Sequence, residues 1–214
     1  MKKLIILLVA LLCVFTVVGC GKKDGGDTTD PVTKDPETVD SGNSSGDSYN
    51  SKAKWIEAKA YNSPAGEDLP IMVRLLEITK DMAKIDPQIA SYKGIYDLST
   101  KPEYTDWVLI VCEQKWPEGS PSGEFGLYKG ADVRITDIES RKAGSVKYRA
   151  AGYYAIQSIE TEKPETMQPG EAYIIKVLTF VPEGMPVEDM AVAFGTYSEY
   201  VIVNIKGEIL PPKE

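Results

Sequence analysis

Histidine is absent from the 214-residue sequence. Serine triads, cysteine–histidine pairs and the usual zinc sites need imidazole, either as a base near neutral pH or as a metal ligand. Its absence sets these classes of enzyme and metal site aside. No glycine-rich phosphate loop follows a strand and opens a helix, so nucleotide binding has no support either. The sequence therefore predicts no cofactor and no metal.

Cysteine is scarce, with three residues in the chain: Cys13, Cys20 and Cys112. Export would remove Cys13 with a signal peptide and consume Cys20 as a lipid site, for the reasons given below. Cys112 is then alone, and no intramolecular disulfide is expected. Within the apolar run Trp107–Cys112, this cysteine is most simply a small buried hydrophobe. Without a histidine to activate it, we expect no catalytic role for it.

Positive charge is also in deficit, because 24 basic residues face 32 acidic ones and give a net charge of −8. Loss of Lys2 and Lys3 with a signal peptide would leave the mature chain at −10. An acidic surface repels the phosphates of nucleic acids, so we expect no nucleic-acid partner. It also disfavours attraction to anionic headgroups, so membrane attachment would have to come from a covalent lipid.

A long apolar run is present at the N-terminus, where residues 4–18 lie between Lys2-Lys3 and Gly19-Cys20. A basic start, an apolar middle and a small-residue exit are the parts of a secretory signal peptide. The run Val17–Cys20 resembles the bacterial lipobox, which implies a signal peptide over residues 1–19, a diacylglycerol thioether on Cys20 and an anchor on the extracytoplasmic face of the cell membrane. The alternative is an ordinary signal peptide or an uncleaved anchor, in which Cys20 is incidental.

Large apolar side chains are rare in residues 21–50, where only Val32, Val39 and Tyr49 occur. Such a segment buries too little surface to offset its ordering entropy. We therefore predict that residues 20–50 are a lipidated, disordered tether with a reach of about 30 Å. Its aspartates lack the alternate-residue pattern and terminal glutamate of a calcium loop, so we interpret them as a solvated linker.

Residues 51–214 have the length of one domain. In the segment Tyr173–Val181, residues of even and odd number point to opposite faces of a predicted strand, and Pro182 ends it. About seven to eight short strands between turn-rich pieces predict a β-sandwich or a barrel. Besides 173–181, the expected strands are 107–113, 125–128, 133–138, 146–150, 153–159, 190–194 and 200–205.

The opening of the domain is ambiguous. Met72, Leu75, Ile78, Met82 and Ile85 recur at helical spacing, and prolines at positions 70 and 87 could bracket a helix. The same stretch begins with alternating apolar residues, as in a strand. We favour a strand over residues 71–78, because a sandwich needs an opening strand, with one short helix near the start as the alternative.

From about Gly66 to Lys206 the sequence resembles bacterial lipoproteins that carry a telokin-like, immunoglobulin-like domain of unknown function. The matching pieces are the turn Gln168–Glu171, the strand end Thr179–Pro182 and the strand Ala191–Phe194. The second strand of that family commonly ends in asparagine, whereas Glu113–Trp116 stands here. The resemblance implies an immunoglobulin-like β-sandwich of about seven to eight strands, and it supplies no catalytic residues.

Tyrosine is in excess, with 12 residues. Its flat apolar face and polar tip suit protein or sugar recognition, although half of the tyrosines would be expected to point into the core of a sheet protein. Tryptophan beside the turn-rich segment 117–123 is another candidate, since binding residues concentrate on loops. The candidate binding surface is Trp116, Tyr148, Tyr153, Tyr154, Tyr197 and Tyr200.

Acid–base chemistry without histidine would fall to carboxylates, as in glycosidases. The candidate acids are expected on exposed strand faces or turns and therefore to be solvated: Asp132, Asp137, Glu160, Glu162 and Glu199. We expect a non-enzymatic, lipid-anchored extracytoplasmic module that binds an envelope protein or glycan. A structural or accessory subunit of an envelope complex is the alternative, and a carboxylate-only glycoside hydrolase is a remote one.

Overall fold

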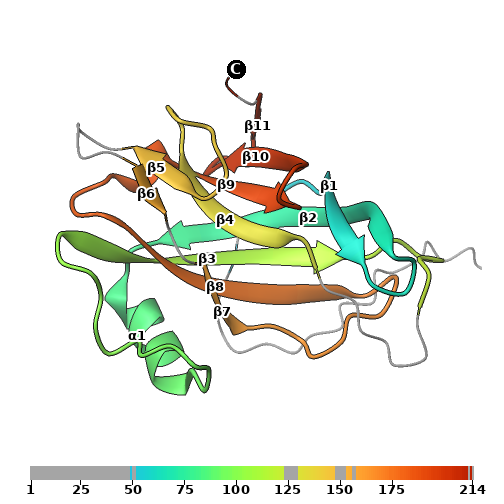
Figure 1. The fold of residues 1–214 in the computed structure, drawn as a ribbon, viewed down its shortest axis with the longest axis horizontal. Helices are drawn as coiled ribbons and strands as arrows, with labels where there is room; N and C mark the ends of the chain where they lie inside the picture. The colour runs from blue at the N-terminus through green and yellow to red at the C-terminus, as the bar shows by residue number, and fades with distance from the viewer. Residues whose placement is uncertain are drawn as a thin grey trace, which may run out of the picture. The chain divides into compact units, whose positions relative to one another are not determined.

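The computed structural model describes residues 49, 52–122, 130–147, 153–155, 158–211 and 213, all within the unit Gly46–Glu214 (Figure 1). The side chains of residues 145–147 and 153–155 are not included in this description. Strands are the main regular structure and hold nearly half of the described residues. In chain order the elements are β1 (Ile56–Asn62), β2 (Glu67–Thr79), α1 (Met82–Ser91), β3 (Thr105–Lys115), β4 (Asp132–Asp137), β5 (Ser145–Lys147), β6 (Tyr153–Ala155), β7 (Ile159–Glu162), β8 (Ala172–Pro182), the 3-10 helix η1 (Val187–Asp189), β9 (Met190–Gly195), β10 (Tyr200–Asn204) and β11 (Ile209–Leu210).

Two antiparallel sheets form the domain, in the orders β1-β2-β3-β8-β7 and β11-β10-β9-β4. A constant-type immunoglobulin domain pairs its strands as A-B-E-D and C-F-G. Here β2, β3, β8 and β7 take the places of A, B, E and D, while β4, β9 and β10 take those of C, F and G, in the same chain order. The predicted immunoglobulin-like sandwich is therefore confirmed, with β1 and β11 added at sheet edges and β5-β6 as a separate hairpin.

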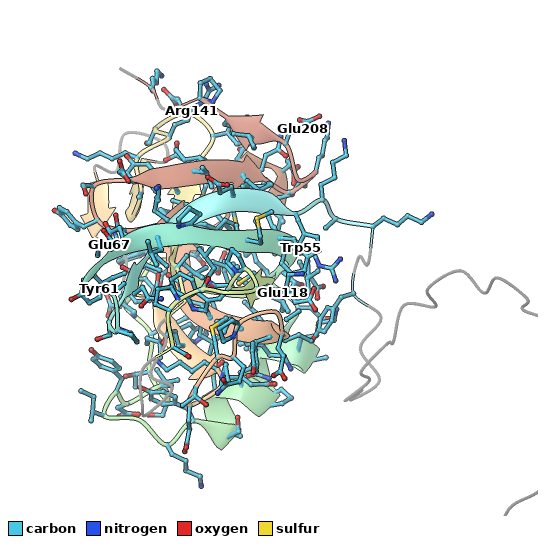
Figure 2. The ribbon with its side chains drawn as sticks, turned by 90° about the vertical axis from the view of Figure 1, so that its right-hand side faces the viewer. Trp55, Tyr61, Glu67, Glu118, Arg141 and Glu208 are labelled. Carbon is cyan, nitrogen blue, oxygen red and sulfur yellow. The ribbon has the colours of Figure 1, made fainter. Side chains whose placement is uncertain are left out.

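The main core lies between the two sheets, and strand alternation builds it. On β3, Val108, Ile110 and Cys112 point into this core, and β8 contributes Ile175, Val177 and Val181 from the odd-numbered face predicted from the sequence. The even-numbered face of β8 packs into a second cluster with Ile85 of α1. In Figure 2 the second sheet, with Arg141 and Glu208 beyond it, lies on one side of the first sheet and α1 lies on the other.

The stretch at the start of the domain, for which a strand and a helix were both considered, contains one of each. The predicted strand over residues 71–78 is confirmed within β2, and a short helix follows it. Asp81 caps α1, because its side chain accepts a hydrogen bond of 3.0 Å from Ala83 N–H. The two prolines do not bracket a helix: Pro87 lies inside α1, and Pro70 lies in β2 before its pairing with β3 begins at Met72, where the missing donor is tolerated.

The strand expected over residues 153–159 is wrong as a single element. Residues 153–155 form β6, which pairs with β5, whereas β7 begins at Ile159 and pairs with β8. The expected strand 125–128 and residues 148–150 lie outside the described residues, as do residues 1–48 with the predicted signal peptide and Cys20. Among the residues that the structure describes, no helix has the length and hydropathy needed to cross a membrane.

Candidate functional site

Tyr197 projects from the tight loop that joins β9 to β10, and 88% of it is exposed. Thr196 N–H donates to the carbonyl oxygen of Glu199 at 2.8 Å, and Glu199 N–H donates to Thr196 Oγ1 at 3.2 Å. Gly195, with φ of 152°, opens the loop; a Cβ built there would lie 2.2 Å from Glu199 O. The loop is therefore closed by its own hydrogen bonds, and it holds an exposed aromatic ring.

Arg134 supports this ring from the outer face of β4. Its guanidinium carbon lies 5.5 Å from the centroid of the Tyr197 ring, within the range of a cation–π interaction. The same guanidinium forms an ion pair with Asp132, two residues earlier on that face. Tyr197, Arg134 and Asp132 thus form a continuous row, here called the Tyr197 surface.

Asp132 connects the Tyr197 surface to a cleft between β4 and β7, which are edge strands of the two sheets. Two cavities of about 360 and 460 Å³ lie in this edge cleft, and both are bordered by Asp132, Glu160 and Lys163. Lys163 forms an ion pair with Glu160 across the turn after β7. Concave sites of this size are typical of small-molecule binding.

The smaller cavity reaches toward the main core. Its inner part is lined by Gln114 and by the apolar side chains of Met167 and Ile175. The larger cavity is open toward the segment after α1, where Tyr92 and Tyr96 line it. The edge cleft thus combines an apolar interior with a charged rim.

The expectation that Trp116 is an exposed binding residue is wrong, because Trp116 is completely buried. It continues the inward alternation of β3 beyond Lys115 and belongs to the main core. Tyr200 is half-buried and packs on Ala191, Ala193 and Ile202 on the outer face of the second sheet. Tyr153 and Tyr154 lie on β6, where the structure describes only their backbone, and Tyr148 lies outside the described residues.

The candidate acids separate into two groups. Asp132 and Glu160 meet at the edge cleft, while Glu162 forms an ion pair with Lys176 and Glu199 is exposed in the β9–β10 loop. The expectation of a solvated Asp137 is wrong, since it is 3% exposed. Its carboxylate accepts hydrogen bonds from the backbone N–H and, at 2.8 Å, the hydroxyl of Ser140, which is a turn-forming arrangement.

Of the five candidate acids, all of which are described, Asp132 and Glu160 are the two that border the edge cleft. The side chain of Asp132 is 60% exposed and that of Glu160 37% exposed, and each is ion-paired. The general acid of a glycosidase works from an apolar, desolvated setting. Neither Asp132 nor Glu160 has such a setting in the edge cleft.

Cys112 is buried in the main core, as predicted, with its Sγ 3.8 Å from the carbonyl oxygen of Ile175. Burial raises the pKa of its thiol to about 12. Its strand, β3, holds the place of immunoglobulin strand B, which carries the first cysteine of antibody domains. The corresponding partner strand, β9, contains no cysteine, and the thiol stays free.

Sequence reasoning missed Arg134 and Gln114 as site residues. The signal for Arg134 was present, because it alternates with Val133 and Ile135 and so points outward from β4. Gln114 falls on the inward face of β3, where a polar residue is unusual and indicates a specific role.

Comparisons with models of protein families, with curated proteins and with solved structures gave no match. The resemblance to telokin-like lipoproteins therefore stays a prediction from the sequence.

Proposed function

We propose that this protein is a lipid-anchored module on the extracytoplasmic face of the cell membrane, and that it binds a protein of the envelope through the Tyr197 surface. The observation that carries the proposal is the contact between the ring of Tyr197, a residue that is 88% exposed, and Arg134, which is itself ion-paired. Tyrosine and arginine are enriched among residues that dominate protein–protein binding energy. A ring held in position before binding loses little entropy when the partner arrives.

The anchor part of the proposal rests on the lipobox-like run Val17–Cys20. Acylation needs the Cys20 thiol, so Cys20→Ser should leave the precursor uncut and unlipidated. Intact-mass measurement of the membrane-extracted protein decides this. An unchanged mature mass for the variant would refute the anchor and leave the binding proposal to be judged separately.

Photo-crosslinking in intact cells tests the binding part. A photoreactive residue at Ser198, which is exposed beside Tyr197, should give a protease-sensitive adduct, and Tyr197→Ser should abolish it. The same residue at Glu183, exposed in the β8–β9 connection, is the control and should give none. An adduct that resists protease but yields to glycan-cleaving enzymes would replace the protein partner with a glycan.

A second candidate function, an accessory subunit of an envelope complex, is favoured by the segment after α1. Ile95 is 91% exposed and its neighbour Tyr96 44% exposed, and exposed apolar side chains of this kind mark interaction sites when they gather. Crosslinking from position 95 instead of position 198 would support this function over the first. Hydrolysis of a glycan that is lost in Asp132→Asn and Glu160→Gln would replace the binding module with a carboxylate-only glycoside hydrolase.

A further inference from the structure

Gln114 occupies an unusual position for an amide side chain. It is 1% exposed and points from β3 into the space between the sheets. Its Nε2 donates a hydrogen bond of 3.0 Å to the carbonyl oxygen of Ala131, which determines the orientation of the carboxamide. The Oε1 atom is buried and has no hydrogen-bond partner among the described residues. A buried acceptor without a partner is destabilising, so its presence calls for an explanation.

Gly130 provides the space in front of this carboxamide. A Cβ at position 130 would lie 2.1 Å from Gln114 Oε1 and 3.5 Å from Met167 Sδ. The φ of Gly130 lies outside the left-handed region, so the backbone itself does not require glycine there. The glycine is therefore needed for room beside the unpaired oxygen, and both residues line the smaller cavity of the edge cleft.

The lining of this cavity defines what it can hold. Met167 and Ile175, both at most 5% exposed, form apolar walls. Three carboxylates stand at the rim. Asp132 is paired with Arg134 and Glu160 with Lys163, which leaves Glu165 without a cationic partner among the described residues. An anionic ligand would be repelled by this rim, whereas a cationic one would be attracted.

We propose that the smaller cavity is a binding site for a small organic ammonium compound. An N–H of the ligand donates to Gln114 Oε1, its apolar body packs against Met167 and Ile175, and Glu165 balances its positive charge. An oxygen that can only accept requires a donor from the ligand, and a primary ammonium has three N–H groups. The site does not depend on Tyr197, so partner binding and ammonium binding can fail separately.

Three probes with one apolar body test the charge and the donor: benzylamine, benzyl alcohol and benzoate. The full chain, purified in detergent micelles, is titrated with each probe while NMR records the side-chain amide of Gln114, with empty micelles as reference. Benzylamine should shift this resonance in a saturable manner and bind about tenfold tighter than benzyl alcohol, and benzoate should produce no shift. Equal binding of benzyl alcohol, or no saturable shift with benzylamine, would overturn the proposal.

Variants locate the site independently of the probe. Gly130→Ala, which closes the space beside Oε1, and Gln114→Leu, which removes the acceptor, should each weaken benzylamine binding about tenfold, measured calorimetrically. If either variant fails to fold, Glu165→Gln at the exposed rim is used instead, and it should weaken benzylamine binding about threefold. Glu183→Gln, an exposed acid outside the cleft, is the matched control. Equal effects of Glu165→Gln and Glu183→Gln would refute the site.

Discussion

The guanidinium of Arg134 lies beneath the ring of Tyr197, 5.5 Å from its centroid, although the two residues come from β4 and from the β9–β10 loop. The contact depends on the pairing of β4 with β9, in which Arg134 lies opposite Ala193. The alanine side chain is small, so it leaves space above the outer face of β9 at this position. The long arginine side chain and the loop therefore meet above it.

Gly195→Ala should destabilise the domain and displace Tyr197. The added methyl group would meet Glu199 O and the Cα of Tyr200, 2.2 and 2.6 Å away, so the loop must open. We expect the free energy of unfolding to fall by about 1 kcal/mol or more, measured by urea denaturation. Ser198→Ala in the same loop should change it by less than about 0.5 kcal/mol. An equally small effect at Gly195 would contradict the described loop.

Trp116→Ala should lower the free energy of unfolding by about 3–5 kcal/mol, because removal of a fully buried tryptophan leaves a large cavity. Thermal or chemical unfolding measures the change. Trp116→Phe, which keeps most of the apolar volume, should cost distinctly less. A stability loss near zero for the alanine variant would indicate that Trp116 is exposed, and would make it a candidate binding residue again.

Asp106→Asn should weaken the domain near neutral pH and have less effect in acid. Burial raises the pKa of the Asp106 carboxyl, but hydrogen bonds from Lys80 Nζ (2.5 Å) and Gly184 N–H (3.0 Å), with the charge of Lys80, outweigh it and hold the pKa below its usual value. A lowered folded-state pKa gives stability that is present above the unfolded-state pKa and is lost as the pH falls through the folded-state pKa.

The measurement for Asp106 is urea unfolding of the wild type and the variant over a pH series. The difference should be about 1 kcal/mol at pH 7, allowing for solvent screening, and should shrink as the pH falls below about 4. Asp68→Asn, at an exposed position on β2, serves as the control and should show no such trend. A difference that grows in acid would have the wrong sign for this ion pair.

Cys112 should resist thiol reagents in the folded protein. Its thiol is buried and its pKa is raised to about 12, so the reactive thiolate is nearly absent at pH 8. Alkylation by iodoacetamide, followed by mass spectrometry, should become rapid only in urea. Rapid reaction under native conditions would mean that β3 opens readily or that the thiol lies near the surface.

Much of the fold was predictable because β3 and β8 are long strands buried on both faces. Their apolar runs are rich in β-branched residues and are bounded by turn residues, which is typical of such strands. The errors have local causes. The predicted end of β3 at Glu113 came too early, so the inward alternation was not continued to Gln114 and Trp116. Asp137 was expected to be solvated because charged side chains usually lie at the surface. It is buried instead, because hydrogen bonds from Ser140 satisfy its carboxylate.

The candidate site was predictable only in part. Tyr197 was identified from its residue type, as one of several tyrosines in the C-terminal half of the domain. Its contact with Arg134 could not be, since it depends on strand register between distant segments. The edge cleft has the same origin: Asp132 and Glu160 lie 28 positions apart and meet because β4 and β7 are edge strands of facing sheets.

The most direct test of the proposed function is the affinity of Tyr197→Ser for the purified partner captured by crosslinking, measured by calorimetry beside the wild type and Ile95→Ser. Because Tyr197 is 88% exposed, the serine variant should keep a melting temperature within about 2 °C of the wild type. It should bind about 30-fold more weakly, the loss of one dominant aromatic anchor. Ile95→Ser should bind within about twofold of the wild type. Unchanged affinity for Tyr197→Ser, with both proteins folded, would contradict the assignment of this surface as the binding site.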